Sequence, residues 1–237
     1  MNSYLPISAK MKMADLVHLD YRLISVLGRF GIEFGFGNKN ISEVCKDYSI
    51  DTSFFLAIVN SYHNHEYFPE DDLITFNSAF LVDYLKKSHN YFLECKLPEI
   101  QHYIDKVEQE SGEQGNNSIK LLNDFFKEYK QELILHFKDE EQNVFSLLLQ
   151  SNKGKIDEEI YEASANSFSG EHPQLETKLS DLKNLIIKFF PSDLSSELSR
   201  KLLFEIFLLE ADLDNHSRIE ERVIAPKIEK LKTQKNG

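Results

Sequence analysis

Four of the eight histidines stand one on each of four long segments with helical periodicity, and their spacing indicates metal chemistry. Neighbouring members of this set lie at similar distances from the turn between them, about 18 to 25 residues along the chain. Because antiparallel helices rise equally per residue, similar distances place the imidazoles at one height in a bundle. Four imidazoles in one layer are typical of a metal site, and the candidates are His89, His136, His172 and His216.

Two of these histidines begin the same H-x-x-x-E pattern, His136 with Glu140 and His216 with Glu220. At about 100° per residue, four positions leave only about 40° between the two side chains, so they share one face of the helix. Such imidazole and carboxylate ligands suit iron or manganese, with zinc as an alternative. Two glutamates from two helices could also bridge a pair of metals.

Each of these features has an ordinary structural interpretation as well. A single histidine on a helix is more often a surface or hydrogen-bonded core residue, and one H-x-x-x-E pair can be a solvated ion pair. The repeated pattern, together with histidines at matching height on the other two helices, favours the metal site. We assign the remaining histidines to structural or surface positions, and His102 is expected to face away from the site.

The segments that carry these residues predict an all-α fold, because apolar residues recur with helical periodicity nearly everywhere. Long helices joined by short loops pack antiparallel, which predicts an up-down-up-down four-helix bundle in residues 75–237. Turn residues separate the expected helices. Their approximate ranges are 78–109, 118–149, 167–190 and 196–231.

Residues 1–70 are predicted to form a small helical N-terminal domain. Its helices are expected over residues 13–30, 41–48 and 52–62, with a glycine-bearing turn at 31–37. The polar segment 63–72, which contains Pro69, is predicted to link this domain to the bundle.

Composition narrows the classes of function. The chain has 237 residues and a formal net charge of −12, which disfavours binding to nucleic acid and to anionic membranes. No apolar run is long enough to cross a bilayer. The two cysteines cannot form a disulfide framework, and the N-terminus lacks the features of a secretory signal. We therefore expect a cytoplasmic protein.

At its histidine and glutamate motifs the chain resembles the hemerythrin-like di-iron proteins. It resembles more closely the RIC family, whose members repair iron centres damaged by nitrosative or oxidative stress. The resemblance includes the small N-terminal domain, and in the bundle it rests on His89 with Leu97-Pro98-Glu99, residues 136–142, Glu171-His172 and residues 216–226. It implies two non-haem irons per chain, with Glu140 and Glu220 as bridges and His89, His136, His172 and His216 as terminal ligands.

The chain departs from the family pattern at two positions. Where the family typically has a Cys-Cys pair followed by glycine, residues 34–37 read Phe-Gly-Phe-Gly, so a thiol role of that pair is lost. The family usually has a further histidine about 21 residues after the first, and Glu110 stands at that position here. Glu110 either replaces this ligand or belongs to a solvated helix end.

Pro173 leaves two possibilities for the start of the third bundle helix, because the residue before a proline is biased away from helical backbone angles. Either His172 sits in the first turn, where proline is tolerated, or the helix begins later.

The leading hypothesis is a stress protein whose di-iron site helps to restore iron–sulfur clusters as an iron donor, with apo iron–sulfur proteins as partners. A second hypothesis is a sensor or carrier that binds O2 or NO. A third is an enzyme that reduces nitric oxide or peroxide at the two irons. The oligomeric state is left open.

Overall fold

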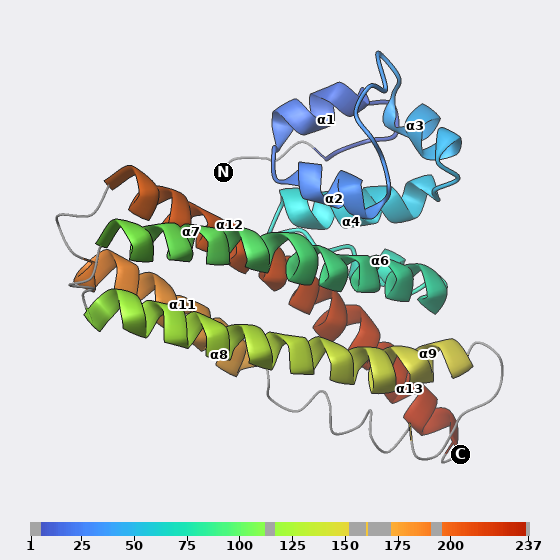
Figure 1. Ribbon diagram of the computed structural model, residues 1–237. Helices are drawn as coiled ribbons and strands as arrows, with labels where there is room; N and C mark the ends of the chain where they lie inside the picture. The colour runs from blue at the N-terminus through green and yellow to red at the C-terminus, as the bar shows by residue number, and fades with distance from the viewer. Residues whose placement is uncertain (1–5, 112–116, 152–159, 161–171, 191–195, 236–237) are drawn as a thin grey trace. The chain divides into compact units, whose positions relative to one another are not determined.

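The computed structural model describes residues 6–111, 117–151, 160, 172–190 and 196–235 (Figure 1). Within these ranges every regular element is a helix, apart from an isolated antiparallel β-bridge between Lys12 and Asn40. This confirms the all-α fold. None of the helices described has both the length and the apolar character that crossing a membrane requires.

The elements follow one another in two groups. The N-terminal helices are α1 (Met13–Leu19), α2 (Leu23–Arg29), α3 (Ile41–Asp47), α4 (Thr52–His63) and α5 (Glu70–Leu73). The long segments after them are α6 (Ser78–Tyr91), η1 (Phe92–Lys96) and α7 (Leu97–Ser111); α8 (Asn117–Asp139), η2 (Glu140–Val144) and α9 (Phe145–Ser151); α11 (His172–Phe189); and α12 (Ser196–Ile219), η3 (Glu220–Ile224) and α13 (Ala225–Lys235). The elements labelled η are π-helical turns.

The chain divides into two compact units, which are described separately. The first unit comprises Met1–Lys87 and Arg218–Lys230, and the bundle unit comprises Ser88–Ser217 and Leu231–Gly237. The domain boundary near residue 70 that the sequence favours remains a prediction.

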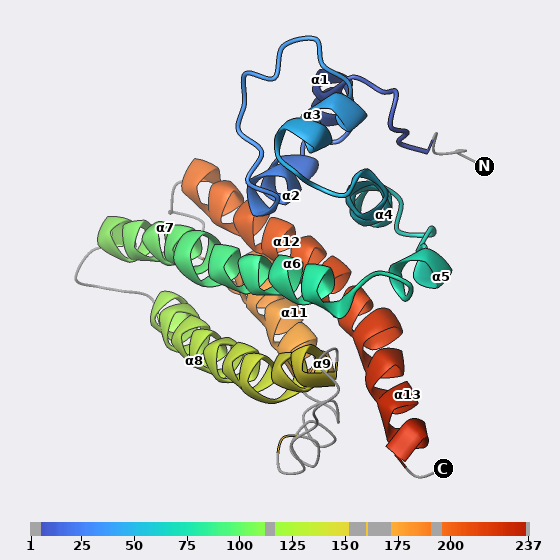
Figure 2. The ribbon, with the colours of Figure 1, turned by 90° about the vertical axis from the view of Figure 1, so that its right-hand side faces the viewer.

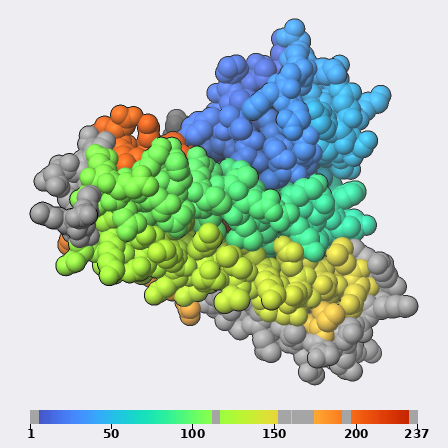
Figure 3. Space-filling model, in the orientation of Figure 1, coloured from blue at the N-terminus to red at the C-terminus, as the bar shows by residue number. Residues whose placement is uncertain are grey.

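In the bundle unit, α7, α8, α11 and α12 lie side by side around one hydrophobic core (Figure 1 and Figure 2). Side chains of α7 and α8 meet along the face seen in Figure 3. Buried apolar and aromatic residues on α8 recur every three or four positions, which gives the helix one apolar stripe facing the core. They are Ile119, Leu122, Phe126, Tyr129, Leu133 and Phe137.

The single helix expected over residues 13–30 is wrong, because the chain leaves the helix at Asp20 and resumes at Leu23. The Asp20 carboxylate accepts hydrogen bonds from the backbone N–H of Arg22 (3.1 Å) and from its guanidinium (2.7 and 2.9 Å). A short acidic side chain that bonds the nearby backbone competes with helix formation. Burial alone would raise the pKa of Asp20, but Arg22, with a smaller contribution from His63, holds it below its usual value.

Arg218 binds the end of α4 and the irregular chain that follows it within the first unit. Its buried guanidinium donates hydrogen bonds to the backbone carbonyls of His65 (2.9 Å) and Ser61 (3.4 Å). It also lies 5.0 Å from the ring centroid of Phe68. Backbone carbonyls in the last turn of a helix and beyond it have no partner within the helix, so they need such donors when they are buried.

The two cysteines lie in contrasting environments. Cys45 is buried in α3, and burial raises the pKa of its thiol to about 11. Cys95 is exposed in η1. Because the thiolate is the reactive form, the raised pKa makes Cys45 unreactive near neutral pH.

We therefore expect Cys95 alone to react rapidly with a chromogenic disulfide reagent in the folded protein. Cys45 should react only after a denaturant is added, because unfolding both exposes the thiol and restores its ordinary pKa. Absorbance during the titration measures both steps. Rapid reaction of both thiols in the native protein would contradict the buried environment of Cys45.

Candidate metal centre

Four buried side chains bring their ligand atoms within 4.8 Å of one another. They are His89 in α6, Glu140 at the start of η2, His216 in the last turn of α12, and Glu220 at the start of η3. None of the four is more than 3% exposed. Burying carboxylates costs free energy unless a cation or hydrogen bonds balance the charge. The cluster therefore has the composition and burial of a cation site.

The spacing of the two imidazoles fits ligands of one metal. The Nε2 atoms of His89 and His216 lie 3.0 Å apart. Without a cation this is a hydrogen-bond distance, and two nitrogens each bound at about 2.1 Å to one cation lie about 3.0 to 3.4 Å apart for bond angles of about 90° to 109°. Neither ring has to move far to share a cation.

Glu140 lies between two imidazoles and presents a different oxygen to each. Its Oε2 is 3.4 Å from Nε2 of His89, and its Oε1 is 3.2 Å from Nε2 of His136. His136, itself only 5% exposed, is one turn before Glu140 on the same continuous helix. A carboxylate in this position can bind one cation through each oxygen.

Aromatic rings form an apolar wall around the two clustered histidines. The Phe137 ring stacks on His89 with centroids 3.9 Å apart and planes 9° from parallel. Phe92 meets His216 edge to face at 5.6 Å, and Phe145 stacks on His89 at 5.5 Å. This packing restricts the ring planes and keeps water from the donors, which strengthens their interaction with a cation.

Three π-helical turns in the described residues lie at the donors. η2 begins at Glu140, η3 begins at Glu220, and η1 follows shortly after His89. A π turn holds one extra residue, so the helix beyond it is rotated by about 100° relative to an uninterrupted α-helix. π turns commonly occur at functional sites, and these three were not predicted from the sequence.

Prolines in the sequence mark two of the π turns. Pro98 and Pro226 are each the second residue of the α-helix that follows a π turn, η1 and η3 respectively. A proline lacks the N–H that an α-helix requires, and the changed hydrogen bonding of a π turn accommodates that loss. The helix therefore continues through Pro98.

The third bundle helix begins at His172, with Pro173 in its first turn. Proline is tolerated there because the first N–H groups of a helix have no partner within the helix. The His172 side chain lies outside the part of the chain whose side chains are described, so its place relative to the cluster remains a prediction.

Glu110 is exposed near the end of α7 and is not among the clustered donors. Helical rise explains this, since 21 residues correspond to about 31 Å along the axis. Two residues so far apart can share a face of the helix but cannot lie at one height. The position therefore belongs to the exposed helix end. His102 is also exposed on α7.

One further residue at the site, Glu141, was not predicted from the sequence. Oε1 of Glu141 lies 2.9 Å from Nδ1 of His89, the ring nitrogen that does not face the cluster. The available signal was the doubled glutamate that ends both motifs, Glu140-Glu141 and Glu220-Glu221.

A groove of about 350 Å³ between α8 and α11 reaches His136. The groove gives small molecules a way to approach the His136 ring. Its lining residues are Glu132, Leu135, His136, Asp139, Gln174 and Leu175.

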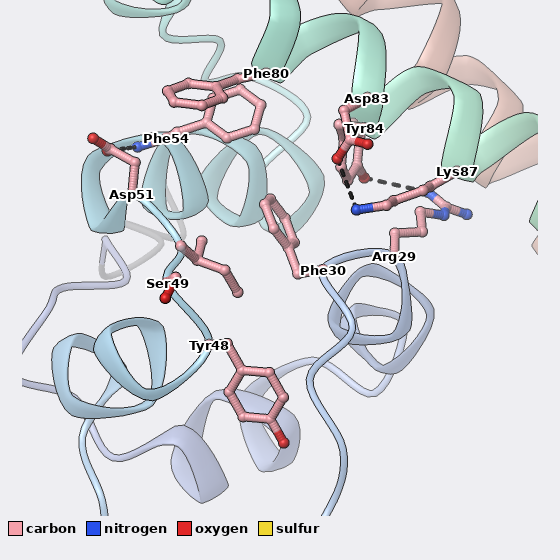
Figure 4. Close-up of a pocket in the computed structure, with 11 residues that line it drawn as sticks. Arg29, Phe30, Tyr48, Ser49, Asp51, Phe54, Phe80, Asp83, Tyr84 and Lys87 are labelled. Carbon is pink, nitrogen blue, oxygen red and sulfur yellow. Dashed lines mark hydrogen bonds and ion pairs between the residues drawn. The ribbon is translucent and has the colours of Figure 1, made fainter.

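A pocket of about 250 Å³ in the first unit has a different character (Figure 4). Its charged groups already interact with neighbours: Asp83 pairs with Lys87 at 2.7 Å, and Arg29 donates a hydrogen bond to the Tyr84 hydroxyl. None of its described lining residues is histidine or cysteine, so it is a poor candidate for a metal. Its aromatic lining consists of Phe30, Tyr48, Phe54, Phe80 and Tyr84.

Comparison with known proteins agrees with a cation site at the buried cluster. Residues 81–228 match the family model described as hemerythrin HHE cation binding domain. The match spans more than half of the chain and includes every clustered donor. No curated protein matches the chain significantly.

We expect a divalent cation to stabilise the wild type and His102→Ala, and to stabilise Glu220→Ala much less, because Glu220 belongs to the buried cluster and His102 does not. At a free concentration 100 times Kd, a cation that binds only the folded chain adds about 2.7 kcal/mol to the free energy of unfolding. Thermal denaturation with Zn²⁺, and with Fe²⁺ under anaerobic conditions, measures the difference. Equal rises in Tm for Glu220→Ala and wild type would show that Glu220 is not a ligand.

Proposed function

Because this chain belongs to the hemerythrin HHE cation-binding family, we propose that its bundle holds two non-haem irons. The observation that carries the proposal is the buried cluster of two imidazoles and two carboxylates. The proposed ligands are two bridging glutamates and four terminal histidines: Glu140, Glu220, His89, His136, His172 and His216.

The proposed division of ligands follows the distances around Glu140. His89 and His216 would bind the first iron together, since their Nε2 atoms are 3.0 Å apart. His136 lies against the other oxygen of Glu140 and would bind the second, together with His172. Both carboxylates would then be shared.

The donor set favours iron over a closed structural zinc site. Imidazole with carboxylate suits Fe²⁺ and Mn²⁺, whereas structural zinc sites usually have four ligands and often include thiolates. Manganese and zinc remain the alternatives for this site. Bound iron would supply redox and Lewis-acid chemistry, and the protein would orient it and exclude water through the Phe92 and Phe137 rings.

We propose further that the centre acts as an iron donor in the cytoplasm, for iron–sulfur clusters damaged by nitrosative or oxidative stress. Two observations support this role. The motifs resemble those of the RIC family, and the proposed ligands include no thiolate, so ferrous iron would be held without a permanent cage. Cys45 is buried and protonated near neutral pH, so we do not expect it to supply thiol chemistry to this donor role. Apo iron–sulfur proteins would be the partners.

The groove beside His136 favours a second candidate function, in which O2 or NO reaches the iron and the protein acts as a sensor or carrier. An enzyme that reduces NO or peroxide would use the same access. The three functions differ in what leaves the protein. A carrier or sensor releases the gas unchanged, an enzyme releases a reduced product, and an iron donor releases the iron itself.

We expect two irons per chain after anaerobic reconstitution with Fe²⁺ and removal of excess metal. The reason is that six donors with two bridging carboxylates complete two neighbouring sites. Elemental analysis measures the ratio, and His102→Ala serves as the control. Wild-type protein without specifically bound metal would overturn the proposed function.

Iron transfer distinguishes the candidate functions. The iron-loaded protein, mixed with an apo iron–sulfur protein, cysteine and a sulfide source, should restore the cluster absorbance, and the loaded Glu220→Ala variant should transfer much less iron. Reversible spectral change with NO, without iron transfer, would favour the sensor or carrier. Consumption of NO or peroxide under reductant would favour the enzyme.

A further inference from the structure

Glu140 and Glu141 contact opposite nitrogens of the same imidazole. Glu140 faces Nε2 of His89 at 3.4 Å, and Glu141 faces Nδ1 at 2.9 Å. Both glutamates lie in η2, yet the Glu140 side chain is 4% exposed and that of Glu141 is 32% exposed. The two neighbouring carboxylates therefore have different environments and act on His89 from different sides.

We propose that Glu141 is a positioning residue that directs Nε2 of His89 toward the metal. This inference rests on the proposed function of the cluster. Glu141 itself is not one of the clustered donors, because its carboxylate lies at the ring nitrogen that faces away from His216.

The chemistry of the pair fixes the position of the imidazole proton. An ionised carboxylate only accepts hydrogen bonds, so Nδ1 of His89 must carry the proton that lies between them. In the neutral ring this leaves the lone pair on Nε2, the nitrogen that faces His216 and Glu140. Glu141 therefore selects the tautomer that can bind a metal.

Glu141 also completes the orientation of the ring. Stacking on Phe137 fixes the plane of the His89 imidazole but does not prevent the ring from sliding or turning within that plane. The hydrogen bond at Nδ1 supplies this second restraint. Carboxylates that hold metal-binding histidines in this way typically change metal affinity by about 10- to 100-fold when they are removed.

The tautomer can be measured without metal. Long-range ¹H–¹⁵N NMR spectra of the metal-free protein at neutral pH should show His89 with its proton on Nδ1. The His89 signals are assigned by comparison with His89→Gln. In Glu141→Ala, the proton should shift substantially to Nε2. A wild-type His89 that carries its proton on Nε2 alone would overturn the proposal, whatever the behaviour of the variants.

Metal affinity provides the second test. Glu141→Ala should weaken Fe²⁺ or Zn²⁺ binding by about 10- to 100-fold. The metal affinity of Glu141→Gln should stay within a few-fold of wild type, since the amide oxygen can still accept a hydrogen bond from the Nδ1–H group. The matched control is Glu128→Ala, which removes one exposed negative charge from α8 and should leave affinity unchanged.

The controls separate this inference from the proposed function. If wild type binds metal and Glu141→Ala binds as tightly as Glu128→Ala, the positioning role is wrong and the metal site stands. If wild type binds no metal, the proposed function fails, and the NMR experiment still decides the tautomer. If Glu141→Ala does not fold, Glu141→Gln decides the question. Metal binding about 10- to 100-fold weaker in Glu141→Gln than in wild type would contradict the proposal, because the glutamine oxygen can still accept the hydrogen bond from Nδ1.

Discussion

Two carboxylates and three imidazoles are held where water hardly reaches, and the structure around them depends on how their charge is balanced. Moving one ion from water into a protein interior costs several kcal/mol. Hydrogen bonds among the groups themselves offset part of this cost, but two glutamates within 4.8 Å of each other repel. A cation at their centre removes both penalties at once. A protein that only needed a stable core would be better served by apolar residues of the same volume.

Local features follow from this requirement. The donors must converge from separate helices, and the π turns at Glu140 and Glu220 let the chain set the direction of the carboxylates without ending the helix. Phe137 restricts the plane of the His89 ring, while Glu141 restricts its rotation. In the first unit, Arg218 fixes buried backbone carbonyls from a position two residues after His216 on the same continuous helix.

Much of the fold and part of the site were predictable from the sequence. Helical periodicity predicted the bundle helices, and equal distances from shared turns located His89 and His216, which the structure brings together. Their role as ligands remains a prediction. Periodicity could not reveal the break at Asp20, which depends on a side chain bonding the local backbone. Periodicity also tells only which face of the helix Glu110 occupies. The rise along the helix axis places Glu110 about 31 Å from His89, too far to share a metal site. Glu141 escaped notice because a hydrogen bond across helices leaves no periodic pattern.

Anomalous diffraction at the iron absorption edge, from crystals of the protein reconstituted with Fe²⁺, would show whether the buried cluster binds iron. Two neighbouring iron peaks are expected at the cluster, with Glu140 and Glu220 between them. His89 and His216 should lie at bonding distance, about 2.0 to 2.3 Å, from the same iron. Iron peaks only at surface carboxylates, with the buried cluster empty, would rule out the proposed di-iron site.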